Sequence, residues 1–130
     1  MTTQERQAYL ASILKDRGYV FDMHKILASA DFEWLKSLGP FAVHTYTGQR
    51  LLDRKTNELI QTAVETALKA DVDQIREHIR LAIEHGASPQ EVLEAMECVV
   101  LPMGMLALRR GLQAWAAETG LEILEPKAPD

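Results

Sequence analysis

The sequence predicts an all-α protein of six to seven helices, and three observations support this fold class. Apolar residues recur at the roughly 3.6-residue spacing of a helix face, and no segment alternates apolar and polar residues as a half-buried strand does. Most of the seven glycines and five prolines fall between segments of helix length. Because the chain has only 130 residues, we expect residues 1–130 to form one domain.

The N-terminal half is expected to contain three helices and a further helical stretch, at 3–18, 20–28, 32–38 and 41–48. Thr3 is the expected N-cap of the first helix and Asp31 that of the third, because short oxygen-bearing side chains accept bonds from the first free N–H groups. Gly18 is a typical C-terminal stop. The Gly39-Pro40 pair should end the third helix, since proline lacks an N–H and disfavours helix in the preceding residue.

The C-terminal half is expected to contain four helices, at 54–70, 74–85, 89–101 and 103–119, followed by a frayed tail over 122–130. Asp53 should cap the first of these helices, and Gly86 should end the second. The strongest local signal is the capping box of Ser88 and Glu91, with Pro89 at the first helical position.

Residues 99–106, with the sequence VVLPMGML, are apolar on every side of the expected helix junction. A junction this apolar belongs either in the deep core or in a seam between subunits. Both interpretations stay open at the level of the sequence.

Composition excludes several classes of function. A net charge of −5 repels phosphate backbones, so we expect no nucleic-acid partner. The single cysteine, Cys98, cannot form an internal disulfide and is interpreted as buried packing. The polar N-terminus and the lack of an apolar run near ~18 residues predict a soluble, cytoplasmic protein without a membrane partner. We find no glycine-rich phosphate loop and no GxSxG motif.

Two of the four histidines lie on one expected helix. His78 and His85 are seven residues apart and share a face, but the ~10 Å between them is too far for one metal ion, so no metal site is expected. His85 has a sufficient structural role in the last helical turn. His78 lies between Ile75 and Ala82 and therefore borders the buried stripe, where a histidine is more often a structural core residue than a catalyst.

Glu58 lies on the preceding expected helix. Its helical position faces away from the apolar stripe, whose members are Leu59, Ile60, Ala63, Val64, Ala67 and Leu68. The simplest interpretation is a solvated carboxylate, paired with Arg54 one turn earlier. The alternative is that another element or another subunit covers this polar face.

Four features in order resemble the carboxymuconolactone decarboxylase family, which also contains the alkylhydroperoxidase D-like proteins. They are the helix start LDRKTNELI at 52–60, the apolar helix that continues from it, His78, and the glycine and cap GASPQEVLE at 86–94. The resemblance covers about residues 52–115. It implies an alkylhydroperoxidase D-like helical domain in a ring-shaped homotrimer or homohexamer, with sites near the subunit contacts.

The two branches of this family differ in their chemistry. The peroxidase branch uses a CxxCxxxH motif, but the two cysteine positions are occupied here by Asp71 and Gln74, which cannot form a thiolate pair. The spacing of Glu58 and His78 is similar to that of the decarboxylase branch, which lacks those cysteines. Where that branch has a tyrosine and Gly-Val-Pro, this chain has LPMGML at 101–106, which implies a more apolar pocket wall.

The resemblance implies a cofactor-independent lyase similar to gamma-carboxymuconolactone decarboxylase, in the catabolism of aromatic compounds. The substrate would be a small cyclic unsaturated carboxylic acid or lactone. His78 would donate a hydrogen bond or a proton to the dienolate, and Glu58 would orient the imidazole. Met103 and Met105 would form an apolar wall beside the substrate. The alternatives are a non-redox oligomeric ligand-binding protein and a lactone hydrolase or isomerase on the same scaffold.

Overall fold

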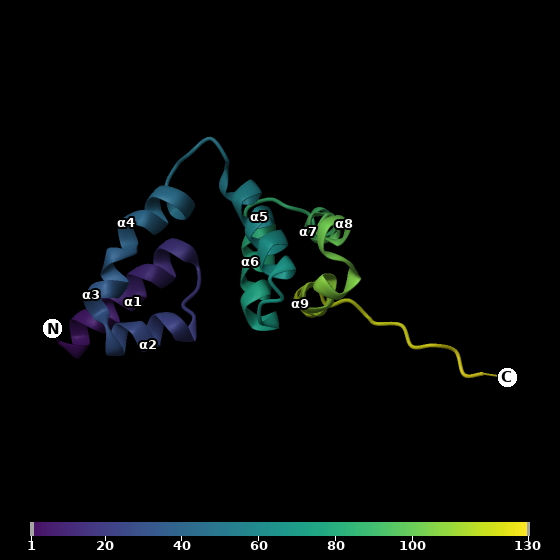
Figure 1. Cartoon of the computed structure of the whole chain (residues 1–130), viewed down its shortest axis with the longest axis horizontal. Coiled ribbons are helices and arrows are strands. Elements are labelled where there is room, and N and C mark those ends of the chain that lie inside the picture. Colours follow the sequence, from purple (N-terminus) through teal and green to yellow (C-terminus); the bar gives the residue numbers. More distant parts are fainter. Residues whose placement is uncertain (1, 130) are drawn as a thin grey trace. The chain divides into compact units, whose positions relative to one another are not determined.

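The computed structural model describes residues 2–129, and all of its regular structure is helical within that range (Figure 1). Met1 and Asp130, the last residue of the predicted tail, lie outside the described residues. The helices are α1 (Thr3–Arg17), α2 (Asp22–Ala30), α3 (Phe32–Ser37), α4 (Gly39–Ala42), a π-helical turn η1 (Val43–Thr47), α5 (Arg54–Ala67), α6 (Val72–Glu84), α7 (Pro89–Glu97), α8 (Val100–Met103), a 3₁₀ turn η2 (Met105–Leu108) and α9 (Arg109–Thr119).

The all-α prediction of six to seven helices is confirmed. Within residues 2–129, seven α-helices have six residues or more, and α4 and α8 are four-residue turns. Two compact units make up the chain, unit 1 (Met1–Asn57) and unit 2 (Glu58–Asp130). The single domain expected from chain length stays a prediction.

Local capping determines where the helices of unit 1 begin. Thr2, one residue before the predicted cap, forms a capping box with Glu5, whose backbone N–H donates to the Thr2 hydroxyl at 3.1 Å. Asp31 caps α3 as predicted, accepting from the Trp34 N–H at 3.3 Å. A small core of Ala28, Phe32 and Leu35 then holds the helices of this unit together.

The helices of unit 2 agree with the predicted boundaries only in part. α6 begins at Val72, inside the turn predicted before residue 74, and its N-cap Asp71 makes no side-chain capping bond. α7 ends at Glu97 rather than at the predicted residue 101.

Ser88 and Glu91 form the expected capping box, with Pro89 as the first residue of α7. The predicted final helix over 103–119 is wrong at its start, because Gly104 has φ 87° and ψ 168° and interrupts it. The chain passes through η2 before α9 begins at Arg109.

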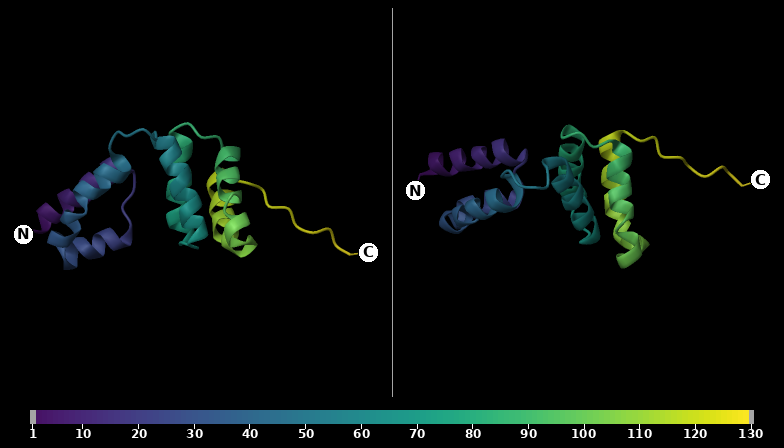
Figure 2. Two further views of the ribbon diagram at one scale, coloured as in Figure 1. Left: turned by 45° about the horizontal axis from the view of Figure 1, so that its top comes forward. Right: turned by 90° about the horizontal axis from the view of Figure 1, so that it is seen from above.

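The core of unit 2 lies between α6, α7 and α9, and α6 packs most closely against α9 (Figure 2). Ile75, Ile79 and Met96 are fully buried there. Gly111 on α9 allows a close approach to α5, since a Cβ at this position would lie 2.6 Å from Cγ2 of Thr66. Only glycine fits this contact without displacing a neighbour.

The face of α5 that the sequence marks as polar is the buried one. Glu58, Thr62 and Thr66 have no exposed surface, so the interpretation of Glu58 as a solvated carboxylate is wrong. The Thr62 and Thr66 hydroxyls donate to the backbone carbonyls of Glu58 and Thr62, each at 2.7 Å, which satisfies these polar groups inside the unit.

The apolar stripe of α5 lies on the opposite side. Ile60, Val64 and Leu68 are 45%, 49% and 73% exposed, so three members of the predicted core stripe lie at the surface. Leu59 still packs against the core of unit 2, but these three positions of the predicted core face are turned away from it.

Two further sequence interpretations are wrong. Cys98 is exposed at the end of α7 rather than buried. The deep-core interpretation of residues 99–106 also fails, because Leu101 is 96% exposed and Leu106 76% exposed, although Val99 is buried. Residues 121–129 contain no helix, in agreement with a non-helical tail (Figure 1). No helix within the described residues is both long enough and apolar enough to span a bilayer.

Candidate active site

Helices α5 and α6 bring the candidate functional side chains together within unit 2. Glu58 and Glu65 are seven residues apart on α5, so they lie on one face about two turns from each other. His78 lies in the middle of α6, and its imidazole reaches both carboxylates. Glu58 is fully buried and His78 is 2% exposed.

The contact between His78 and Glu58 is short and well aligned. Nδ1 of His78 lies 2.8 Å from Oε2 of Glu58, within hydrogen-bonding range. The structure thus joins the two residues that the sequence nominated as the catalytic pair, although they are 20 residues apart in the chain. A buried charge-assisted bond of this kind fixes the orientation of the ring.

A second carboxylate, which is not among the predicted site residues, lies at the other ring nitrogen. Nε2 of His78 lies 3.2 Å from Oε2 of Glu65, which is within ion-pair distance. This oxygen is buried and accepts no hydrogen bond from the described residues, so the contact is not aligned as a hydrogen bond. The other oxygen of Glu65, Oε1, accepts from Nε2 of Gln74 at 2.7 Å. His78 is therefore enclosed between Glu58 and the Glu65–Gln74 pair.

Two sequence signals could have found the additional pair. Glu65 shares the helical face of Glu58, and Gln74 lies one turn before His78 on α6. Gln74 occupies a cysteine position of the CxxCxxxH motif, and that correspondence predicts no role for a glutamine.

The two carboxylates keep His78 protonated at neutral pH. Burial alone would lower the pKa of His78, but the hydrogen bond that its Nδ1–H donates to Glu58 and the contact with Glu65 outweigh burial and raise the pKa from 6.5 to about 9. The group at the centre of the site is thus an imidazolium that carries a transferable proton. Among residues 2–129, no three His, Cys, Asp or Glu side chains are grouped so as to hold a metal ion.

Comparison with known proteins shows the family of this chain. The sequence model of the carboxymuconolactone decarboxylase family matches residues 33–117. The chain belongs to that family. It is also similar in structure to a proposed carboxymuconolactone decarboxylase from Burkholderia xenovorans, with a TM-score of 0.77, 21% identity and coverage of 92% of both chains. At this identity the likeness shows a shared fold. None of the curated protein sequences is significantly similar to this chain.

The other predicted site residues of this carboxymuconolactone decarboxylase family member lie at its surface. Met103 ends α8 and is 55% exposed, and Met105 begins η2 and is 66% exposed. The departure from the family pattern at 101–106 therefore places apolar side chains on the exterior of unit 2. Contact of these two methionines with a substrate stays a prediction.

The remaining histidines have local roles. His24 is buried in unit 1, where its Nδ1 accepts from the Phe21 N–H at 3.0 Å, and burial followed by the nearby Arg17 lowers its pKa. His85 is the C-cap of α6, the position where an imidazole interacts favourably with the helix end.

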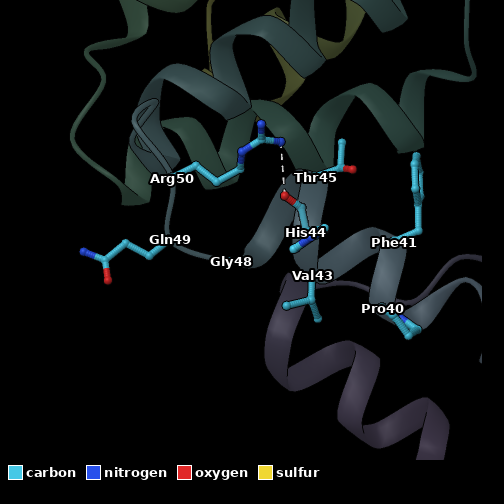
Figure 3. A pocket seen from close by; sticks show the side chains of 8 residues that line it. All are labelled: Pro40, Phe41, Val43, His44, Thr45, Gly48, Gln49 and Arg50. Atoms are coloured by element: carbon cyan, nitrogen blue, oxygen red, sulfur yellow. Dashed lines mark hydrogen bonds between the residues drawn. The ribbon is translucent and has the colours of Figure 1, made fainter.

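His44 borders a hollow of about 700 Å³ in unit 1. Nη1 of Arg50 donates to the His44 carbonyl at 3.1 Å across this hollow (Figure 3). Phe41 and Val43 point to opposite sides and Gln49 points outward (Figure 3), so the polar groups of the hollow do not converge on one point. It lacks the converging polar groups of a catalytic site.

Proposed function

We propose that this protein is a cofactor-independent carboxy-lyase that decarboxylates a small cyclic unsaturated carboxylic acid or lactone. Membership of the carboxymuconolactone decarboxylase family supports the reaction class. The observation that carries the proposal is the buried imidazolium of His78, held at 2.8 Å by Glu58. Such a group combines a proton to donate with a fixed orientation, which are the requirements of a general acid.

The proposed reaction needs one acid and a place for developing negative charge. As the C–CO₂ bond breaks, its electron pair moves into the conjugated carbonyl and forms a dienolate. The positive charge on His78 stabilises that dienolate, and the imidazolium then transfers a proton to carbon. Glu58 stabilises the imidazolium before the transfer and holds the neutral ring until solvent returns the proton. The products are CO₂ and the substrate ring, which now carries the proton from His78 on carbon, so atoms and charge balance.

We further propose that copies of this chain assemble through the exposed apolar surface of unit 2. Ile60 and Val64 on α5, and Leu101 and Leu106 beyond α7, are exposed although all are large and apolar. Large apolar side chains that are exposed in this number indicate a protein–protein contact. In such a homotrimer or homohexamer, Met103 and Met105 would form part of the apolar wall beside the substrate.

Substitution of the catalytic pair tests the proposed lyase activity. In a panel of small cyclic unsaturated acids and lactones, release of CO₂ should fall about 100-fold or more in His78→Gln, which lacks the acid. Glu58→Gln should reduce the rate less, because the acid remains and only its orientation and pKa change. Circular dichroism and thermal unfolding check that both variants are folded.

Glu77→Gln is the matched control, since Glu77 is adjacent to His78 in sequence but pairs with Arg80 at the surface. It removes the same charge and should leave turnover unchanged. Unchanged turnover in both site variants, with the wild type active, would refute the proposal.

A ligand-binding role is the second candidate, and one observation favours it. Both ring nitrogens of His78 are engaged by carboxylates, as they would be in a purely structural tie between α5 and α6. That role predicts binding of a small acid without any product. A lactone hydrolase or isomerase would use the same residues, and the product distinguishes it, since neither of those reactions releases CO₂.

A further inference from the structure

We propose that Glu65 determines which ligands the site accepts: its carboxylate holds the place beside Nε2 of His78 that a ligand's carboxylate takes, so binding exchanges one anion for another. The inference rests on the proposed function in one respect, that His78 is the group that meets the ligand. It adds a specificity-determining residue, Glu65, and a positioning residue, Gln74.

The two carboxylates hold His78 with unequal strength. Glu58 is fully buried and makes an aligned contact of 2.8 Å with Nδ1. The Glu65 side chain is 14% exposed and lies 3.2 Å from Nε2, where its oxygen accepts no aligned hydrogen bond. A buried oxygen without such a bond gives up much of the stabilisation that the contact could provide. Replacing Glu65 by a ligand therefore costs less free energy than replacing Glu58.

Only one of the two ring N–H groups of His78 is accessible to a ligand. The ring has two N–H groups, and the one on Nδ1 is held by a side chain with no exposed surface. A ligand that is to receive a hydrogen bond or a proton from His78 must do so at Nε2, where Glu65 now lies. Gln74 donates to Oε1 of Glu65 at 2.7 Å and so determines how firmly that carboxylate is kept in place.

Charge then selects the class of ligand. Glu58, His78 and Glu65 together carry one positive and two negative charges when the ring is protonated. A ligand carboxylate that replaces Glu65 keeps a second anion beside the imidazolium. A neutral ligand of the same shape would leave the buried imidazolium without that second anion, so its binding is disfavoured.

Other charged groups nearby are engaged elsewhere. Arg76 on α6 pairs with Glu118 on α9 at 3.0 Å. Arg80 on α6 pairs with Glu77 and Glu84. These pairs leave the two α5 carboxylates as the groups that contribute to the pKa shift of His78.

Benzoate and benzamide test the inference, since they have nearly the same shape and differ in charge. Calorimetry gives their Kd values for the full-length protein, and the NMR signals of the His78 ring report where they bind. We expect wild type to prefer benzoate, and Glu65→Gln to bind benzoate about fivefold more tightly, because the competing anion is gone. Benzamide should gain no comparable affinity. Gln74→Leu should change benzoate affinity in the same direction by a smaller factor.

The control is again Glu77→Gln, which removes a charge without touching the imidazole and should leave both Kd values unchanged. Equal binding of the two probes by the wild type would overturn the inference, as would weaker benzoate binding by Glu65→Gln with Gln74→Leu unaltered. Absence of a His78 shift with either probe would also overturn it. If benzoate binds as expected while no acid in the panel loses CO₂, the lyase proposal fails and the role of Glu65 stands.

Discussion

The imidazolium of His78, between the buried carboxylate of Glu58 and the partly exposed carboxylate of Glu65, makes the stability of the chain depend on pH at the scale of one residue. The pKa of His78 is raised from 6.5 to about 9 in the folded protein. A group whose pKa is higher in the folded state stabilises that state fully when the pH is below its pKa in the unfolded chain. This stabilisation is lost as the pH rises through its pKa in the folded protein. The window for this effect is therefore pH 6.5 to about 9.

We predict that the free energy of unfolding falls by roughly 3 kcal/mol between pH 6.5 and pH 9.5, because one pKa unit corresponds to about 1.4 kcal/mol. Urea unfolding at a series of pH values measures this change. In the His78→Gln variant the decrease should be largely absent, since that side chain does not titrate. Parallel curves for wild type and variant across the whole window would contradict the prediction.

At the scale of the element, α5 is the helix whose orientation depends on its neighbours. Its threonines bury their hydroxyls by bonding back to the preceding turn, and Gly111 on α9 makes room for Thr66. A side chain at position 111 would force the two helices apart. The approach of α5 to α9 thus depends on one missing methyl group.

We predict that Gly111→Ala destabilises the protein by about 1 to 2 kcal/mol, because the overpacking cost exceeds the gain in helix propensity. In a Thr66→Ala background, which removes Cγ2 and Oγ1, the same substitution should be neutral or stabilising. Urea unfolding of both single variants and the double variant completes the cycle. Additive effects of the two substitutions would show that the close contact is not the cause.

The elements themselves could be read from the sequence to a large extent, because their signals are local. Asp31, Asp53 and Ser88 each cap the helix that follows them, as expected from their side chains. The orientation of α5 could not be predicted from its own pattern, since it depends on which neighbours accept its polar face.

For the site, the joining of Glu58 to His78 followed from spacing and the family resemblance. Helical spacing places Glu65 on the face of Glu58 and Gln74 one turn before His78. Their contacts with each other and with the imidazole depend on the relative placement of α5 and α6, which no local pattern contains. The exposure of Met103 likewise depends on the interruption at Gly104, where the chain leaves helical geometry.

At the scale of the whole molecule, unit 2 exposes large apolar side chains on the surface of the single chain. The stripe on α5 and the segment after α7 are both helical surfaces rich in large aliphatic side chains. Burying such surfaces between copies of the chain is favourable at about 25 cal/mol per Å². The proposed assembly therefore follows from the inverted orientation of α5.

We predict that light scattering after size exclusion gives a mass that is a multiple of 14.6 kDa, corresponding to three or six copies. Val64→Lys places a charge in the middle of the apolar stripe and should shift the population toward the monomer. Ser29→Lys, at an exposed position of α2 in unit 1, is the control and should leave the mass unchanged. A wild-type mass of 14.6 kDa would refute the proposed assembly.

The exposed position of Cys98 has a practical consequence for such measurements. Since the sequence contains one cysteine, a maleimide fluorophore would attach at a single place without any mutagenesis. Mixing donor-labelled and acceptor-labelled chains would then report subunit exchange by energy transfer, in dilute samples and in real time.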